Sequence, residues 1–225
     1  MSRVLVVDWN WDGAQRELQR DLDLDRSNAN IFRNAAYLYR TLGRYDLAES
    51  AAQSAVDRDP LNYYNYCRLG EAKASVRKYP EAEAGFRHAL ALQASADGLH
   101  ADLAGSLLDQ GKPDEALAEL HRETDPAIKA LNLPIAFYLT RRKDDAERAL
   151  TYAQGVYGAT APGAIANIYA VRHDLDRAFL WWNRALRTHS RGMPPDISTP
   201  YEARCPELAT NPRWIAMFRK LKLTG

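Results

Sequence analysis

Histidine, cysteine and acidic side chains are the residues of this chain that could bind a metal ion or activate a nucleophile. No histidine stands at metal-ligand spacing from a second histidine or a cysteine. The five are His88, His100, His121, His173 and His189. His121 and Glu123 are close together in a predicted loop, and Asp21, Asp23 and Asp25 fit a solvated helix end better than a cation site. We therefore predict no metal site and no cofactor.

Sequence motifs for catalysis are also missing. The chain has no HExxH, CxxC or GxSxG pattern, and the glycines of GVYGATAPG are not followed by the Lys-Ser/Thr pair of a phosphate-binding loop. Trp181 and Trp182 would suit ligand stacking, but helical spacing favours Trp182 in the core with Trp181 as a partly covered neighbour. We expect no catalytic residues and interpret the protein as not an enzyme.

The composition is that of a folded protein with little net charge. Of 225 residues, 46% are hydrophobic and 26% are charged, and the formal net charge is +1. No apolar run approaches the ~20 residues that span a bilayer, and MSRVLVVDWNW lacks the cleavage site of a signal peptide. Residues 187–225 hold seven Lys/Arg against three Asp/Glu, which a solvated helix explains without nucleic acid. We expect a cytoplasmic protein with Cys67 and Cys205 reduced, and with neither a nucleic acid nor a membrane as partner.

The strongest regularity in the sequence is a recurring pair of predicted helices. A small residue returns in steps of 34 residues and then of 30 and 32: Ala14, Ala48, Ala82, Ala116, Ala146 and Ala178. A large apolar residue follows four positions later and usually a small one seven positions later, so all three share one helix face. Gly43 and Gly111 stand where a first helix should end, and Pro60 stands just past a second helix. The pattern predicts antiparallel helix pairs in close contact at the alanines.

This period and the alternation of small and large residues resemble the tetratricopeptide repeat (TPR). The resemblance implies an all-α, right-handed superhelix, an α-solenoid, of about five helix-pair repeats with a C-terminal capping helix. We place the array at residues 1–190, with units near 9–27, 29–62, 63–96, 97–126, 127–158 and 159–190, and a loop and capping helix at 191–225. DWNWDGAQRELQRDLDLD, DRAFLWWNRAL and NPRWIAMFRKLKL are further similar to the TPR C-terminal regions of bacterial winged-helix, adenylate cyclase or kinase regulators.

Three segments depart from the regular pattern. SRVLVV stands where the first copy should have its first helix. Pro134 falls inside the expected first helix of the fourth copy, and we expect it to shorten or kink that helix. RGMPPDISTPYEARCPELAT is predicted to be mostly loop. The last helix then begins with Asn211 as N-cap and Pro212 at its first position, and its apolar stripe, which includes Trp214, should cover the last repeat.

In a solenoid of helix pairs, the first helices of successive units line a concave surface that can bind a peptide. The positions opposite the packing face are our predicted peptide-binding residues. They are Asn30, Arg33, Tyr37, Arg40, Tyr64, Cys67, Glu71, Leu108, Leu131, Ile135, Tyr138 and Asn167. Some repeats of this family hold a terminal carboxylate with a set of Lys, Arg and Asn side chains, which is matched here only in part, for example at Arg68.

We predict a protein-protein interaction scaffold that binds a peptide or helix of a partner in its concave groove, with Arg33 and Arg40 setting the polarity of the ligand. The alternative is a sensory or regulatory TPR region of a larger bacterial signalling or transcription regulator, which binds an effector or self-associates. A third interpretation leaves the same residues in contact with the chain's own tail or with a second protomer.

Overall fold

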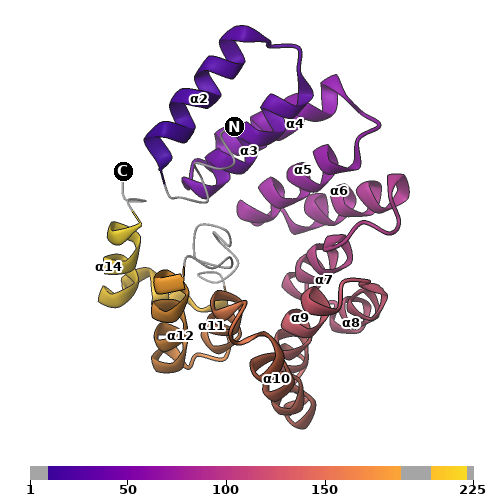
Figure 1. Cartoon of the computed structure of the whole chain (residues 1–225). Helices are drawn as coiled ribbons and strands as arrows, with labels where there is room; N and C mark the ends of the chain where they lie inside the picture. Colours follow the sequence, from indigo (N-terminus) through magenta and orange to yellow (C-terminus); the bar gives the residue numbers. More distant parts are fainter. Residues whose placement is uncertain (1–9, 189–203, 222–225) are drawn as a thin grey trace. The chain divides into compact units, whose positions relative to one another are not determined.

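The computed structural model describes residues 10–188 and 204–221, and all regular structure within these ranges is helical (Figure 1). The prediction of an all-α fold is confirmed. His189, the segment SRVLVV and residues 191–203 of the predicted loop lie outside the described residues. The chain divides into two compact units, Met1–Ala94 with Met217–Gly225, and Ser95–Ala216. The division falls inside the predicted array.

The described part of the first unit contains five complete helices. They are α2 (Trp11–Leu24), α3 (Ala29–Thr41), α4 (Tyr45–Arg58), α5 (Tyr63–Ser75) and α6 (Tyr79–Leu92). α3 pairs with α4 and α5 pairs with α6, while α4 contacts α5 (Figure 1). Asparagine side chains cap α2, α3 and α5 by accepting a backbone N–H of the first turn. These three helices therefore begin with residues whose side chains satisfy otherwise unpaired N–H groups, whereas α4 and α6 have no side-chain cap.

A buried asparagine joins the two helix pairs of the first unit. The Nδ2 group of Asn65 donates to the backbone carbonyls of Ala55, at 3.1 Å, and Asp59, at 2.8 Å. These carbonyls belong to the end of α4 and the turn after it, and that of Ala55 also accepts the backbone N–H of Asp59 at 3.1 Å. Asn65 therefore fixes the angle at which α5 leaves α4.

The second unit repeats the same arrangement three times. Its paired helices are α7 (Leu99–Asp109), α8 (Pro113–Arg122), α9 (Pro126–Leu139), α10 (Lys143–Tyr157), α11 (Pro162–Val171) and α12 (Leu175–Thr188). The pairs are α7 with α8, α9 with α10, and α11 with α12 (Figure 1). The sequence predicts that Pro134 shortens or kinks its helix; the shortening is wrong, because α9 continues through Pro134 to Leu139, and the kink stays a prediction. The buried proline removes one backbone donor, and the helix bonds on both sides remain.

The recurring alanines are the contact points of the helix pairs, as their spacing predicts. All six are exposed by no more than 1%: Ala14, Ala48, Ala82, Ala116, Ala146 and Ala178. The side chains four positions later are buried as well: Leu18, Ala52, Phe86, Leu120, Leu150 and Trp182. A methyl group lets the partner helix approach closely, and, except at Ala52, the larger neighbour fills the adjacent space. The predicted core position of Trp182 is thereby confirmed.

Each described turn between paired helices holds one residue in the left-handed conformation, five positions before the recurring alanine. These residues are Gly43, Arg77, Gly111, Arg141 and His173, with φ between 60° and 72°. Glycine adopts this conformation without a steric penalty, whereas an L residue loses about 1–2 kcal/mol there. The predicted helix ends at Gly43 and Gly111 are confirmed. Arg77, Arg141 and His173 adopt the same left-handed conformation although they are not glycine, so the geometry of the repeat imposes the turn on them.

A buried carboxylate organises the shortened third repeat. Glu123 lies between α8 and α9, and its Oε1 atom accepts the backbone N–H groups of Thr124, Asp125 and Gly98, at 3.0, 3.1 and 3.2 Å. Its Oε2 atom accepts the N–H of Ala101 at 3.3 Å. The side chain therefore ties the start of α7 to the α8–α9 connection. Glu123 has a structural role, and the neighbouring His121 is exposed.

The C-terminal helix caps the last pair, as predicted. The 3-10 helix η2 (Pro206–Thr210) leads into α14 (Pro212–Lys220), and Asn211 Oδ1 accepts the N–H of Arg213 at 2.9 Å. Trp214 is buried with its ring centroid 4.8 Å from that of Trp182. No described helix is both long and apolar enough to cross a bilayer.

Candidate functional site

The predicted residues of α3 and α5 lie close together in the first unit. α3 and α5 are the first helices of successive pairs, and they contact each other directly. The polar and aromatic side chains that interact along this contact come from both helices. We call this set the arginine–tyrosine surface: Arg33, Tyr37, Arg40, Tyr64, Arg68 and Glu71.

Glu71 is the centre of the charged part of this surface. Arg68 Nη1 contacts both carboxylate oxygens of Glu71, at 2.5 and 2.6 Å. Arg40 Nε lies 3.4 Å from Glu71 Oε2, and Cys67 Sγ lies 3.6 Å from Oε1. Two guanidinium groups thus share the carboxylate of Glu71.

Burial and charge act in opposite directions on the pKa of Glu71. Burial alone would raise the pKa of this carboxyl group, but the charges of Arg68 and Arg40 outweigh burial and hold the pKa below its usual value. Burial alone would likewise lower the pKa of Arg68, but the charge of Glu71 raises it. Glu71 and Arg68 are therefore both charged at neutral pH.

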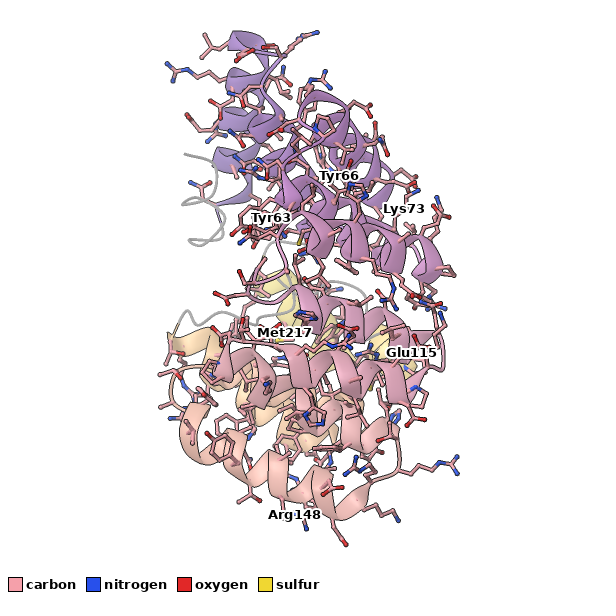
Figure 2. The ribbon with its side chains drawn as sticks, turned by 90° about the vertical axis from the view of Figure 1, so that its right-hand side faces the viewer. Tyr63, Tyr66, Lys73, Glu115, Arg148 and Met217 are labelled. Carbon is pink, nitrogen blue, oxygen red and sulfur yellow. The ribbon has the colours of Figure 1, made fainter. Side chains whose placement is uncertain are left out.

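Aromatic rings extend the surface along both helices. The guanidinium carbons of Arg68 and Arg40 lie 5.0 and 5.9 Å from the ring centroid of Tyr37, within the range of a cation–π interaction. Arg33 lies 5.5 Å from the ring centroid of Tyr64, which is 47% exposed. Tyr63, labelled in Figure 2, lies with its ring centroid 4.2 Å from that of Tyr64.

Two further predicted residues of the first unit differ in exposure. Asn30 is exposed in the first turn of α3, where the side chain of Asn28 accepts its backbone N–H at 3.0 Å. Cys67 is buried and a free thiol, as is Cys205, in agreement with the predicted absence of a disulfide. Asn30 therefore lies at the accessible end of α3, whereas the buried thiol of Cys67 contacts the carboxylate of Glu71.

The predicted residues of the second unit do not form a comparable set. Leu108, Leu131 and Tyr138 are half-buried, and the Tyr138 ring lies 5.6 Å from the guanidinium of Arg172. Ile135 is buried at 6% exposure, so it belongs to the core of its repeat.

Asn167 is also buried, at 3% exposure. Its Oδ1 atom accepts the indole N–H of Trp182 at 3.0 Å, which joins α11 to α12 inside the last pair. The side chain thus satisfies the one polar atom of a buried tryptophan. We leave Ile135 and Asn167 out of the candidate surface.

The chain's own tail covers part of α7. Arg204 Nε donates to Asp109 Oδ1 at 2.8 Å, and Arg204 Nη2 donates to the carbonyl oxygen of Gly105 at 3.1 Å. Both side chains of this ion pair are exposed by less than 15%. On α7 the tail therefore contacts Gly105 and Asp109, next to the predicted residue Leu108.

A second group of polar side chains lies where this tail meets the α11–α12 turn. His173 Nδ1 is 2.6 Å from Glu207 Oε1, and Cys205 is fully buried beside them. Burial, and then the hydrogen bond and charge of Glu207, raise the pKa of the Cys205 thiol to about 12. A thiol with that pKa is protonated at neutral pH and is a poor nucleophile.

Sequence reasoning left several of these residues out of the predicted site. Arg68 stands three positions before Glu71, an ion-pair spacing on a helix, so its role could have been inferred from that interval. Cys205 and Glu207 carry no such signal, because their partner His173 is more than thirty positions away in the sequence. Only the folded tail brings these three together.

Comparisons with known proteins bear on the fold. No protein-family model and no curated protein matches the sequence. Among solved structures, PilW, a type IV pilus biogenesis factor, is similar with a TM-score of 0.63 and 16% identity, covering 88% of this chain and 95% of PilW. A tetratricopeptide repeat protein from Parabacteroides merdae has a TM-score of 0.58 and 14% identity, covering 100% and 90%.

YrrB, described as a TPR protein with an unusual peptide-binding site, is also similar. Its TM-score is 0.50 and its identity 17%, covering 84% of this chain and 97% of YrrB. At identities this low the likeness establishes the fold alone. Together with the buried alanines and the five left-handed turns, it shows that this chain has the helix-pair fold of the tetratricopeptide repeat proteins.

Proposed function

We propose that this chain is a protein-interaction module that binds an acidic peptide segment of a partner through the arginine–tyrosine surface. The observation that carries the proposal is the gathering of guanidinium groups and tyrosine rings on α3 and α5, where Arg40 and Arg68 share the carboxylate of Glu71 beside Tyr37. Arg33 adds a third guanidinium on the same helix as Arg40. Arginine is well suited to bind carboxylates, because its planar group can donate two parallel hydrogen bonds.

The tyrosines give this surface a second kind of contact. Tyr64 is half-exposed next to Arg33, so it can bury an apolar group of a peptide while Arg33 pairs with an acidic one. Large aromatic rings and arginines are the side chains that most often dominate binding energy at protein interfaces. The peptide-binding site of YrrB supports this class of function by analogy of fold.

Two finer points belong to the same proposal. We infer a cytoplasmic location, which two free cysteines support. We also keep the alternative of a sensory or regulatory TPR region of a larger bacterial signalling or transcription regulator, which binds an effector or self-associates.

An array of 15-residue acidic peptides, each paired with a copy in which Asn and Gln replace Asp and Glu, would test the proposal. We expect the purified chain to bind acidic peptides and not their amide copies, with affinity that falls as salt is raised. Fluorescence anisotropy with the tightest peptide then gives the dissociation constant of each variant. Arg33→Glu should weaken binding at least about tenfold, since it replaces attraction by repulsion, and Tyr64→Ala should weaken it several-fold.

Arg87→Glu is the matched control. Arg87 lies on α6, is half-exposed and pairs with Glu83 at 2.8 Å, so the substitution makes the same change of charge away from the surface. It should change the dissociation constant by less than about twofold. Equal losses in Arg33→Glu and Arg87→Glu, or preferential binding of the amide peptides, would show that the arginine–tyrosine surface is not the binding site.

A further inference from the structure

The side chains of His173, Cys205 and Glu207 have a chemistry that peptide binding does not use. Each offers one atom that can bind a metal, and these three atoms all lie within 4.8 Å of one another. The sequence alone predicts no metal site, because the residues come from two distant segments. We propose that the three side chains form a Zn²⁺ site that fastens the C-terminal tail to the last helix pair of the second unit. The proposal is independent of the proposed peptide binding.

The kinds of atom favour zinc among the common ions. An imidazole nitrogen, a thiolate sulfur and a carboxylate oxygen are the three ligand types that Zn²⁺ takes in proteins, whereas Mg²⁺ and Ca²⁺ prefer oxygen alone. Bonds of about 2.0–2.3 Å at tetrahedral angles separate the ligand atoms by about 3.3–3.7 Å. The His173 and Glu207 atoms, now 2.6 Å apart, would move slightly apart around the ion.

Backbone hydrogen bonds hold the segments that carry the three residues. His173 occupies the left-handed position of the α11–α12 turn, and its N–H donates to the carbonyl of Ala170 at 2.9 Å. Cys205 and Glu207 flank the start of η2, where Leu208 donates its N–H to the carbonyl of Cys205 at 3.1 Å.

The exposure of these side chains allows an ion to enter. The side chains of His173 and Glu207 are 51% and 40% exposed, so an ion and one further ligand such as water can reach them from solvent, whereas Cys205 is buried. The site is therefore open on one side and closed by the thiol on the other.

The positive charge nearest in sequence to this group has a carboxylate partner of its own. Arg172 precedes His173 in the chain, but its guanidinium pairs with Glu147. Binding replaces the thiol proton of Cys205 by the metal and releases that proton to solvent, so the site holds a thiolate and a carboxylate against the two positive charges of Zn²⁺.

Zinc titration of the full chain, produced without a polyhistidine tag and stripped with a chelator, tests the proposal. We expect one Zn²⁺ per chain in competition with a chromophoric chelator, and a thiolate-to-metal charge-transfer band when Co²⁺ is used instead. Cys205→Ser and His173→Gly should each weaken binding at least about 100-fold, and Glu207→Gln at least about tenfold. Zinc should also raise the melting temperature of the wild type and not of these variants.

His173→Gly is the decisive variant, because glycine occupies the same left-handed turn position at Gly43 and Gly111 and should preserve the fold. Arg141→Gly makes the equivalent change in the preceding turn of the same unit, and Cys67→Ser removes the other thiol. Both controls should leave zinc affinity within about twofold of the wild type. A wild-type chain that binds no zinc, binds it as weakly as His173→Gly, or shows no thiolate band with Co²⁺ would overturn the proposal.

Discussion

The close approach of α5 and α6 in the first unit predicts that Gly70→Ala destabilises the protein. A methyl group built on Gly70 would stand 2.7, 2.8 and 3.0 Å from three ring carbons of Phe86. Carbon atoms that are not bonded to each other pack best at about 3.5–4.0 Å. The ring would therefore have to retreat by roughly half an ångström or more, and Phe86 is buried at 2% exposure.

The backbone offers little room for that retreat. On the facing helix, a methyl group at Gly85 would stand 3.2 Å from backbone atoms of Gly70, so α5 and α6 touch backbone to backbone. Overpacking of this kind costs about 1–3 kcal/mol, while alanine gains about 1 kcal/mol over glycine inside a helix. We expect Gly70→Ala to lower the free energy of unfolding by about 1 kcal/mol.

Gly155→Ala is the matched control. Gly155 lies within α10, is exposed, and has nothing within 4 Å of an added methyl group, so only the helix preference of alanine acts there. This variant should be more stable by up to about 1 kcal/mol. Urea unfolding followed by circular dichroism measures both changes, and hydrogen exchange should place the loss in α5 and α6. Phe86→Leu should partly rescue Gly70→Ala. A Gly70→Ala variant as stabilised as Gly155→Ala would refute the packing argument.

Three further predictions concern single side chains. Because the pKa of Glu71 is lowered in the folded state, the stability that its carboxylate contributes is present above about pH 4.3, the usual carboxyl value, and is lost as pH falls through the folded pKa. The difference in urea midpoint between wild type and Glu71→Gln should therefore shrink on acidification. A difference that stays constant with pH would contradict this. Trp214→Ala should lower the free energy of unfolding by about 3–5 kcal/mol because it uncovers Trp182, and the melting temperature should fall. An unchanged melting curve would show that the tail does not contribute to stability. Glu123→Gln should cost about 1.5–3 kcal/mol because it weakens charged hydrogen bonds to four N–H groups, while Glu115→Gln at an exposed position should have little effect in the same urea titration.

The helix pairs could be predicted from the sequence because their contacts are local and periodic. A buried alanine such as Ala82 and the large residue four positions later share one face of one helix, so the contact requires only that the next helix folds back. The same reasoning located the turn glycines and the asparagine cap of the last helix. The predicted positions on α3 and α5 also came together, because equivalent positions of successive repeats lie side by side.

The same positional rule did not distinguish surface from core in the second unit. Ile135 and Asn167 have the helical phase of a surface residue, yet both are buried, and Asn167 holds an indole N–H inside its pair. Phase along one helix says which residues share a face, but what covers that face depends on the neighbouring helices and the tail. Pro134 shows the same limit, since its helix continues to Leu139 although local preference favours an earlier end.

The repeat, the turn positions and the capping helix are thus determined by the order of residues, because each depends on neighbours within about one helix pair. The Glu71 charge cluster, the Glu123 carboxylate and the His173, Cys205 and Glu207 group are decided only by tertiary structure. Their partners come from different helices or from the tail. The distance between two such side chains depends on how every intervening helix packs, and no interval in the sequence records that distance.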